Sequence, residues 1–386
     1  MAPDPIHIVF LPAPLSEPIT GGEIYNNRLF DFLKSRFDSV TGIRERKKNT
    51  STRTVIQYLR YTISCLIINF RYALKLMNLN REGQKIIIIE DIYSITDFFI
   101  LNRIVKCRFK RIHIVPLIHH LMFPQYDGIV SKLTYFFEKQ VVTNSKLIIV
   151  TSEETKMEVS NLQELQEMEK EILVATPGLG FKECRGLSTD IIDSSNINIV
   201  SVGTVSRRKD YETLIRAICE LKTRELVYSI KVIIVGDRDK EKEYAQEMEK
   251  LAERLCISDV VRFVGRVSDQ ELCGILEHAD IYVCTSTHEG FGMAIAEAMR
   301  FHLPIVASNA GAIPLLVQNG ITGMLFSPKD PSDLSNKLAY LLKSSEIRNQ
   351  MGEYGYARSL SFDWDVSFRK IEKALNNLAD EGRLGD

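Results

Sequence analysis

Residues 281–297 are Ile-Tyr-Val-Cys-Thr-Ser-Thr-His-Glu-Gly-Phe-Gly-Met-Ala-Ile-Ala-Glu, and this stretch indicates the fold class more clearly than any other part of the chain. Its first four residues form an apolar run without alternation, which is typical of a strand buried on both faces of a parallel sheet. A polar, glycine-containing loop follows, and then a helical pattern over Gly292–Arg300. The stretch therefore predicts a strand, loop and helix of an α/β fold, with the loop at the strand end where such sheets bind ligands.

The same alternation of strands and helices extends outward in both directions from this stretch. In the second half the expected strands are Ile197–Gly203, Ile230–Gly236, Val260–Val264, Ile281–Cys284 and Pro304–Ala307, and the expected helices are Tyr211–Leu221, Glu241–Leu255, Asp269–Ala279, Gly292–Arg300, Pro331–Lys343 and Trp364–Leu378. In the first half the expected strands are Ile6–Leu11, Lys85–Glu90, Ile112–Leu117 and Leu147–Thr151, and the expected helices are Glu23–Phe37, Thr54–Met77, Thr96–Cys107 and Ile129–Thr143. Two Rossmann-like halves with parallel sheets follow from this pattern.

The length of the chain, 386 residues, also favours two domains, because a single hydrophobic core seldom grows that large. A stretch rich in Pro, Gly and Ser, Pro177–Ser195, interrupts the alternation and is expected to be the linker. We expect an N-terminal Rossmann-like domain over 1–180 and a C-terminal Rossmann-like domain over 196–360. The last segment, 361–386, is expected to be a helix that packs back toward the first domain.

The loop after the strand Ile281–Cys284 has the residues that a phosphorylated ligand needs. Gly290 and Gly292 let the backbone approach a ligand, and the free N–H groups at the start of the next helix suit a diphosphate. Glu289 lies before that helix and Glu297 lies inside it, so the two carboxylates address different parts of one long ligand. A nucleotide sugar, with hydroxyls on its sugar and on its ribose, fits this arrangement.

The pair Glu289 and Glu297, separated by seven residues, resembles the signature of glycosyltransferase family four. These are retaining enzymes of the GT-B fold, in which two Rossmann-like domains have parallel sheets that face each other across a cleft. The flanking segments Val261–Val267 and Leu303–Phe326 resemble the family as well. The similarity is close over about Ile197–Asp333 and looser over the first half.

The resemblance implies roles for individual residues of the second half. Glu289 would contact the donor sugar, Glu297 the ribose, and the amides of Phe291, Gly292 and Met293 would hold sugar and phosphate. The domain over 196–360 would then bind the nucleotide sugar, and the domain over 1–180 the acceptor. In the family, an arginine and a lysine bind the diphosphate of the donor. Lys209 matches that lysine, but Thr204 occupies the position of the arginine. Either Arg207 or Arg208 compensates, or the donor is handled differently. The donor-binding residues expected in this half are Thr204, Arg208, Lys209, Gly236, Arg266, Glu289, Gly290, Phe291, Gly292, Met293 and Glu297.

Two features of the first half resemble the family more loosely. Gly21 and Gly22 open a helix after the first strand, like the glycine-rich loop that approaches the diphosphate. His119 and His120 follow Ile112–Leu117, and only one of two adjacent residues faces a given side. Of these two histidines, His119 is the better match to a histidine that lies near the transferred sugar in the family. We therefore expect the catalytic residues to be His119, Glu289 and Lys209.

Two other motifs are excluded as functional signatures. The Gly290-Phe291-Gly292 loop lacks the third glycine of a dinucleotide fingerprint, because that position is Ile295. We interpret Asp237-Arg238-Asp239 as a turn after Gly236 rather than as a metal-binding motif. No metal and no cofactor are expected, and a net charge of −1 argues against a nucleic-acid partner.

A basic region lies between Thr41 and Lys85, where ten Lys and Arg residues face only Glu45 and Glu82. Its interspersed apolar residues fit an amphipathic helix on an anionic membrane surface, and they equally fit a core helix with long cations reaching solvent. If the first alternative holds, the acceptor is a membrane lipid. The chain has seven scattered cysteines, no basic leader before Ile6 and no apolar run long enough to span a bilayer. A cytoplasmic protein, with peripheral membrane contact at most, is therefore expected.

The expected function is a retaining transferase that moves a hexose-type sugar from a UDP- or GDP-sugar to a lipid or glycan. No carboxylate nucleophile stands out, so front-face attack assisted by the leaving phosphate is the working mechanism. Two alternatives stay open. One is a nucleotide-sugar epimerase or hydrolase on the same fold, and the other is a non-catalytic nucleotide-sugar binding module, which Thr204 suggests.

Overall fold

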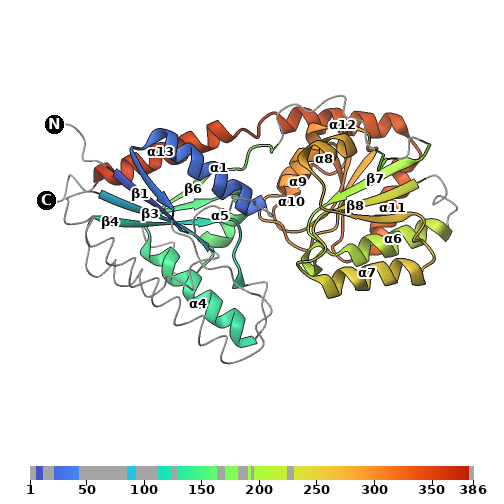
Figure 1. Cartoon of the computed structure of the whole chain (residues 1–386), viewed down its shortest axis with the longest axis horizontal. Coiled ribbons are helices and arrows are strands. Elements are labelled where there is room, and N and C mark those ends of the chain that lie inside the picture. The colour runs from blue at the N-terminus through green and yellow to red at the C-terminus, as the bar shows by residue number, and fades with distance from the viewer. Residues whose placement is uncertain are drawn as a thin grey trace. The chain divides into compact units, whose positions relative to one another are not determined.

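The computed structural model of the chain describes residues 6–11, 21–42, 85–92, 111–123, 128–162, 170–180, 190–192, 195–223 and 230–381. The chain divides into two compact units, coloured along the sequence in Figure 1. Unit 1 is Met1–Thr176 together with Asp365–Asp386, and unit 2 is Pro177–Trp364. Each unit contains its own parallel sheet.

The sheet of unit 1 has six parallel strands in the order β2-β1-β3-β4-β5-β6. Its strand β3, which contains four consecutive isoleucines, is buried along its whole length, as expected for an inner strand of a parallel sheet. The strands are β1 (Ile6–Leu11), β2 (Ser39–Gly42), β3 (Lys85–Asp91), β4 (Ile112–Ile118), β5 (Leu147–Val150) and β6 (Glu171–Val174).

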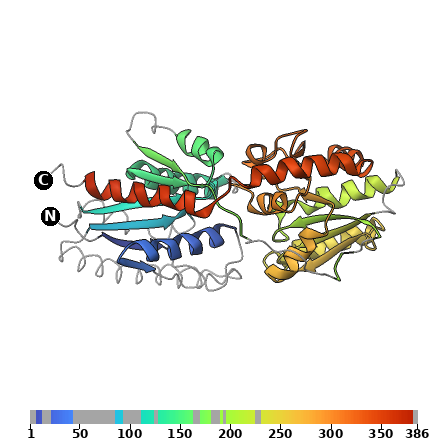
Figure 2. The same cartoon turned by 90° about the horizontal axis from the view of Figure 1, so that it is seen from above.

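Helices cover both faces of this sheet (Figure 1). On one face α13 runs alongside α1, as Figure 2 shows, and the ring of Phe368 on α13 packs against Tyr25 and Phe32 of α1. On the other face α4 and α5 pack through Val141, Val142 and Val159 onto Ile118 and Ile148 of the sheet. The helices of unit 1 are α1 (Gly21–Arg36), α4 (Gly128–Asn144), α5 (Glu153–Ser160) and α13 (Trp364–Glu381).

The sheet of unit 2 has six parallel strands in the order β12-β11-β10-β7-β8-β9. They are β7 (Ile197–Val202), β8 (Ile230–Val235), β9 (Val261–Gly265), β10 (Ile281–Cys284), β11 (Ile305–Ser308) and β12 (Gly323–Phe326). The helical segments are η4 (Arg207–Lys209), α6 (Tyr211–Thr223), α7 (Lys242–Arg254), α8 (Asp269–Glu277), α9 (Met293–Arg300), α10 (Ile313–Leu316), α11 (Pro331–Leu342) and α12 (Ser345–Ser359). One core cluster lies on each face of the sheet.

The predicted α/β class with two parallel sheets is confirmed. Most predicted elements lie within a few residues of the observed ones, but the sequence analysis missed β2, β6, β12, α5, α10 and α12. The expected helices Thr54–Met77 and Thr96–Cys107, and almost all of the basic region, lie outside the described residues.

Of the ten basic residues of this region, Lys85 alone lies within the described ranges, and it is not a surface cation. It is 7% exposed at the start of β3, and its Nζ donates a hydrogen bond to the carbonyl oxygen of Ala379 on α13. Lys85 therefore adds no charge to the surface. The membrane contact of the basic region stays a prediction, because its other basic residues lie outside the described residues. Among the described residues, no helix combines the length and the apolar character that crossing a bilayer requires.

Candidate functional site

The carboxylate of Glu289 is the centre of the site in unit 2. One of its oxygens, Oε1, lies 2.7 Å from Lys209 Nζ and 3.1 Å from Arg208 Nη1. The hydroxyl of Ser286 donates a hydrogen bond to the same oxygen at 2.7 Å. The side chain of Glu289 is only 12% exposed. Two cations and a hydroxyl thus converge on one carboxylate at the end of β10.

The charges around Glu289 keep it ionised. Burial by itself raises the pKa of a carboxyl group, but Lys209 and Arg208 outweigh that effect, and the pKa of Glu289 lies far below its ordinary value. Glu289 is therefore a hydrogen-bond acceptor at any physiological pH and has no proton to give. A carboxylate of this kind suits sugar hydroxyls, which donate to it.

Hydrogen bonds hold the loop after β10 against the η4 turn. The Thr285 hydroxyl donates to the carbonyl oxygen of Lys209 at 2.7 Å, and the backbone N–H of Thr287 donates to that of Arg208 at 2.9 Å. Arg208 in turn donates from Nη1 to the carbonyl oxygen of His288 at 2.7 Å. These bonds fix the distance between the basic residues and Glu289, so the cluster is built into the fold.

The helix α9 begins four residues beyond Glu289, at Met293. Gly292 precedes the helix with φ of 96°, a left-handed conformation that favours glycine. The N–H groups of Met293 and its neighbour have no partner within the helix, because they come first in it. Phe291 is 8% exposed and packs edge-on against Phe362 with ring centroids 5.4 Å apart. This anchored loop leaves Gly290 and the helix N-terminus available to an anion.

The two arginines beside Lys209 point in different directions. Arg207 donates from Nη2 to Glu247 Oε2 at 3.1 Å, and its guanidinium lies 5.3 Å from the centre of the Tyr244 ring, so it is directed to α7. Arg208 is directed to Glu289. Of the two candidates for replacing the missing arginine at Thr204, only Arg208 lies at the cluster.

Gly203 and Gly236, at the ends of β7 and β8, lie in close backbone contact. A Cβ atom on Gly236 would come within 2.0 Å of the carbonyl oxygen of Gly203, so no larger residue fits there. The N–H of Val205, next to Thr204, donates to the carbonyl oxygen of Asp237 at 2.8 Å. The predicted donor residues Thr204 and Gly236 thus lie side by side at the strand ends.

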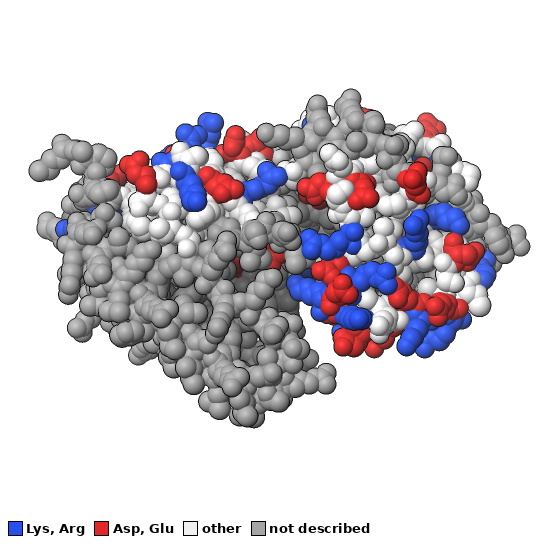
Figure 3. Space-filling model, viewed as in Figure 1, with Lys and Arg blue, Asp and Glu red and all other residues white. Residues whose placement is uncertain are grey.

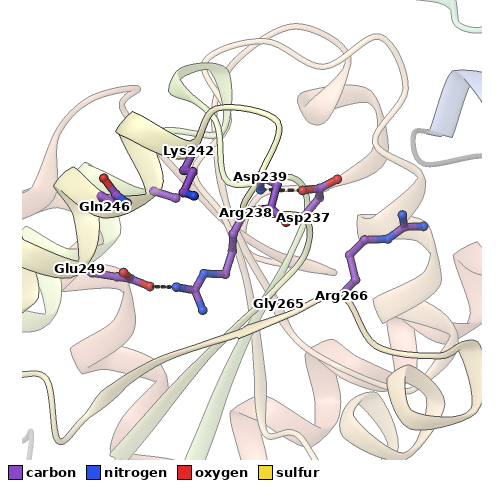
Figure 4. Close-up of a pocket in the computed structure, with 9 residues that line it drawn as sticks. Asp237, Arg238, Asp239, Lys242, Gln246, Glu249, Gly265 and Arg266 are labelled. Atoms are coloured by element: carbon purple, nitrogen blue, oxygen red, sulfur yellow. Dashed lines mark hydrogen bonds and ion pairs between the residues drawn. The ribbon is translucent and has the colours of Figure 1, made fainter. Parts of the chain in front are cut away.

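The turn after Gly236 borders a pocket of about 300 Å³ between β9 and α7. Figure 4 shows Arg238 paired with Glu249 on one side of this pocket and the predicted donor residue Arg266 on the other. Asp237 Oδ1 accepts hydrogen bonds from the backbone N–H groups of Asp239 and Lys240 at 2.7 and 3.3 Å. Asp237 therefore caps its own turn, as interpreted from the sequence, and no group of three metal-binding side chains occurs in the described ranges.

Glu297 lies on α9 against the segment that joins the units. Its Oε1 is 2.5 Å from the point that a Cβ atom on Gly180 would occupy, so a side chain there would displace the carboxylate. The neighbouring turn is fixed by Trp364, whose indole N–H donates to the carbonyl oxygen of Leu179 at 2.8 Å. Glu297 and Glu289 are thus held at separate places in unit 2.

In unit 1, His119 follows β4 and is 7% exposed, whereas His120 is half-buried. The His119 ring packs edge-on against Tyr25 with centroids 5.3 Å apart. Gly22 covers the ring so closely that a Cβ atom there would lie 3.2 Å from His119 Cδ2. His119 and Gly22, predicted separately, therefore belong to one cluster.

Asn26 and Asp91 determine the state of His119. Asn26 donates from Nδ2 to Asp91 Oδ2, which leaves its Oδ1 to accept from His119 Nε2 at 3.1 Å. The neutral ring therefore carries its proton on Nε2 and leaves Nδ1 as an acceptor. Burial lowers the pKa of His119, and the charge of Asp91 only partly offsets this. His119 is thus a neutral imidazole.

A third buried carboxylate, Glu138 on α4, holds the loop that follows His119. Its oxygens accept from the backbone N–H groups of Met122 at 2.6 Å and Phe123 at 3.2 Å. Burial raises the pKa of Glu138 to about 7, although these two donors lower it. Glu138 therefore ties the loop that follows His119 to α4.

The structure brings together most of the residues that the sequence pointed to, and adds others. Lys209, Arg208 and Glu289 form one cluster in unit 2, and Gly22 and His119 form one in unit 1; their roles toward a donor stay predictions. Sequence reasoning missed Asn26, Asp91 and Ser286. Asp91 ends an apolar strand, Lys85–Asp91, and the rule that polar residues at strand ends bind ligands would have found it.

Comparisons with known proteins agree with the motif resemblance. Residues 190–358 match the family model described as glycosyl transferases group 1. A D-inositol 3-phosphate glycosyltransferase of Corynebacterium jeikeium is 31% identical over 260 residues, which are 64% of this chain and 61% of that protein. One of Streptomyces scabiei is 32% identical over 168 residues, or 43% of this chain and 38% of the other. The chain thus aligns with about three fifths or less of these curated relatives.

Solved structures match nearly the whole chain in fold. Sucrose-phosphate synthase from Thermosynechococcus elongatus has a TM-score of 0.76 at 18% identity, over 97% of this chain and 99% of that one. HepE of Anabaena, solved in complex with UDP and glucose, has a TM-score of 0.71 at 18% identity, over 96% and 99%. These similarities confirm the GT-B fold that the motifs predicted.

Proposed function

We propose that the chain is a retaining glycosyltransferase, since residues 190–358 match the family model of the glycosyl transferases group 1. It moves a hexose-type sugar from a UDP- or GDP-sugar to a lipid or glycan acceptor. The observation that carries the proposal is the cluster of Glu289, Lys209 and Arg208 directly before the N-terminus of α9.

In this proposal, positive charge in unit 2 attracts and orients the diphosphate of the donor. Lys209 and Arg208 bring two positive charges to the single negative charge of Glu289, and the first N–H groups of α9 add the positive end of a helix dipole. A diphosphate beside this cluster gains charge-assisted hydrogen bonds from both sources. Glu289 then accepts from hydroxyls of the sugar, and Glu297, held apart from it, accepts from the ribose.

Arg208 takes the role of the arginine that Thr204 replaces. Its guanidinium already lies 3.1 Å from the carboxylate that accompanies the donor, whereas Arg207 is engaged with Glu247. Guanidinium groups bind phosphate oxygens in pairs, so Arg208 can stabilise the negative charge that grows on the leaving diphosphate.

His119 of unit 1 acts on the transferred sugar. A neutral ring with Nε2 bonded to Asn26 offers Nδ1 as an acceptor for a sugar hydroxyl. The acceptor hydroxyl attacks from the face that the diphosphate leaves, and a phosphate oxygen takes its proton, so the configuration at the anomeric carbon is retained. Catalysis then rests on positioning and on stabilising the diphosphate, and no step needs a metal or a cofactor.

We place the protein in the cytoplasm, where sugar nucleotides are available, with an anionic membrane as a further partner of the basic region 44–85. The cysteines support this only in part. Among the described residues Cys219, Cys256 and Cys284 are free, but Cys273 is in a disulfide bond.

Calorimetry with UDP- and GDP-sugars, followed by product analysis on lipid and glycan acceptors, tests the proposal. We expect one class of donor to bind, and Glu289→Gln to abolish sugar transfer while the free nucleoside diphosphate still binds. If no sugar nucleotide binds the folded protein, the proposal fails.

Two other functions stay testable in the same experiment. An epimerase or hydrolase would release nucleoside diphosphate, or isomerise its sugar, without any acceptor. A non-catalytic binding module, which the replacement of arginine by Thr204 favours, would bind the donor and leave it unchanged. Donor consumption that depends on an acceptor excludes both.

A further inference from the structure

The helix α4 of unit 1 exposes large apolar side chains on the face that points away from the core. Ile129 is 74% exposed, Leu133 52% and Phe136 49%, and Val130 beside them is 50% exposed. At about 100° per residue, Ile129, Leu133 and Phe136 fall within an arc of roughly 60° on one side of the helix. A monomeric protein seldom leaves such a stripe in water unless it binds something.

The charged residues of α4 also differ between its inward and outward faces. Its only acidic residue, Glu138, is 2% exposed and turned inward to the N–H groups of Met122 and Phe123. Lys132 is exposed next to the apolar stripe, and Lys139 lies one turn beyond Phe136 with its Nζ 6.0 Å from the Tyr135 ring. The outward side of α4 is thus apolar and cationic, with no exposed carboxylate of its own.

An apolar stripe whose neighbouring charged residues on the helix surface are all cations fits one kind of surface. A helix that lies in the interface of an anionic bilayer buries its apolar side chains among the lipid tails, while its lysines contact the headgroups. The face of unit 2 seen in Figure 3 differs, because Lys and Arg residues there alternate with Asp and Glu residues.

We propose that the outward face of α4, formed by Ile129, Val130, Lys132, Leu133 and Phe136, docks unit 1 onto an anionic membrane surface. A second copy of the chain is a poorer occupant, because a contact between two copies of this face brings lysines from both sides and no exposed carboxylate of α4 to pair with them. The segment between Thr41 and Lys85 is also a poorer occupant, since its ten basic and two acidic residues repel the lysines of α4.

Vesicle co-sedimentation of the full chain tests the proposal. We expect the protein to bind vesicles of phosphatidylcholine mixed with phosphatidylglycerol, and to bind pure phosphatidylcholine much more weakly. The triple variant I129S/L133S/F136S should lose binding by about tenfold or more, because each serine removes buried apolar area. K132E should weaken binding as well, and added salt should do the same by screening.

A matched control separates this face from general surface hydrophobicity. Tyr354 and Leu360 in unit 2 are 50% and 58% exposed, so Y354S/L360S removes comparable apolar surface elsewhere and should leave vesicle binding unchanged. Circular dichroism and the melting temperature show that each variant is folded. Donor binding by calorimetry should be equal in all variants, which keeps this test independent of the proposed transferase activity.

Two outcomes would overturn the proposal. In the first, the wild-type protein does not sediment with anionic vesicles, or the α4 triple variant sediments as well as the wild type. In the second, light scattering finds a dimer in solution that the α4 triple variant converts to a monomer, which assigns the face to a second copy of the chain.

Discussion

At the scale of single residues, the state of Glu289 follows from its neighbours and not from its own chemistry. A buried carboxyl group would ordinarily favour its protonated form, yet Lys209 and Arg208 hold the pKa of Glu289 far below its usual value. The same pair of cations is available to a diphosphate. The residue that contributes most to this balance is Lys209, because its Nζ is the nearer cation at 2.7 Å.

Lys209→Met should therefore weaken the site without unfolding it. We expect sugar transfer to fall by about a hundredfold, the usual effect of removing one group that stabilises developing charge. Steady-state kinetics and calorimetry with the donor measure the loss. Arg207→Met is the matched control, since Arg207 is a neighbouring cation that contacts Glu247 instead, and it should change the rate by no more than about twofold. Equal losses in the two variants would contradict the assignment of Lys209.

Asp91 should act on the reaction only through His119. It accepts from Asn26 Nδ2 and so fixes which end of the Asn26 amide faces the ring. In Asp91→Asn the amide can turn round, and the His119 tautomer is no longer determined. We expect kcat to fall about tenfold, the value of one hydrogen bond, while KM for the donor stays nearly constant.

Nitrogen NMR of His119 distinguishes this role from a structural one. The wild-type ring should carry its proton on Nε2, and the Asp91→Asn protein should show both tautomers. A variant with reduced kcat but an unchanged tautomer would mean that Asp91 acts in another way.

The residues of the two clusters differ in how far the sequence could identify them. Glu289 and Glu297 lie in one short motif after an apolar strand, so local spacing is enough. The cluster in unit 1 combines three separate elements: Asn26 lies on α1, which follows β1, Asp91 ends β3, and His119 follows β4. These residues meet only because β1, β3 and β4 are neighbours in the sheet. The choice of Arg208 over Arg207 depends on which side chain the η4 turn directs to β10, and no spacing rule supplies that.

At the scale of secondary-structure elements, α4 both holds a loop and exposes an unusual face. Glu138 accepts from Met122 and Phe123, so this helix positions the loop that follows His119. The strands and helices that the sequence analysis missed are short or mostly polar. β12 has four residues and α12 is dominated by polar side chains, so neither gives a periodic apolar signal. The apolar run of β3, four consecutive isoleucines, was recognised as a strand because burial on both faces gives an uninterrupted apolar stretch.

Glu138 should make the stability of unit 1 depend on pH. Burial raises its pKa from 4.5 to about 7 in the folded protein. Below pH 4.5 the group is protonated in both the folded and the unfolded chain, so it does not make the free energy of unfolding depend on pH. Between pH 4.5 and 7 the unfolded chain releases the proton and the folded one does not, so the free energy of unfolding falls as pH rises, by up to about 3 kcal/mol.

Glu138→Gln removes this dependence because an amide does not titrate. Melting temperatures measured from pH 5 to pH 8 should show the variant gaining on the wild type as pH rises, even if the loss of one acceptor lowers its stability at pH 5. Glu171→Gln, at an exposed position on β6, is the control and should not change the slope. A constant difference between Glu138→Gln and the wild type across this range would refute the pH effect.

At the scale of the whole molecule, the chain crosses between its units at two places, near Thr176 and near Trp364. The second crossing returns α13 to the unit that contains the N-terminus. The helix brings Phe368, Ile371 and Leu375 into the core of unit 1, where they are 2%, 0% and 0% exposed. Lys85 of β3 also donates to the carbonyl oxygen of Ala379. Unit 1 is thus completed by residues that lie more than 180 positions after its last strand, whereas unit 2 is continuous in sequence.

This arrangement predicts different responses of the two units to a chain that ends at Trp364. Removal of α13 exposes several core side chains of unit 1, at roughly 1.5–3 kcal/mol for each large one, and the sum is comparable to the whole stability of an ordinary domain. Unit 2 loses no core residue and keeps Lys209, Arg208 and Glu289 in place. Scanning calorimetry of the shortened chain should therefore show that the transition of unit 1 disappears or moves to a much lower temperature while that of unit 2 is retained.

Donor binding by the shortened chain should stay within about threefold of the wild-type affinity, because the proposed donor cluster lies in unit 2 and includes no residue of α13. If the shortened chain melts in one transition at the wild-type temperature, α13 adds little to the stability of unit 1. If it keeps the unit 2 transition but no longer binds the donor, the donor site needs unit 1.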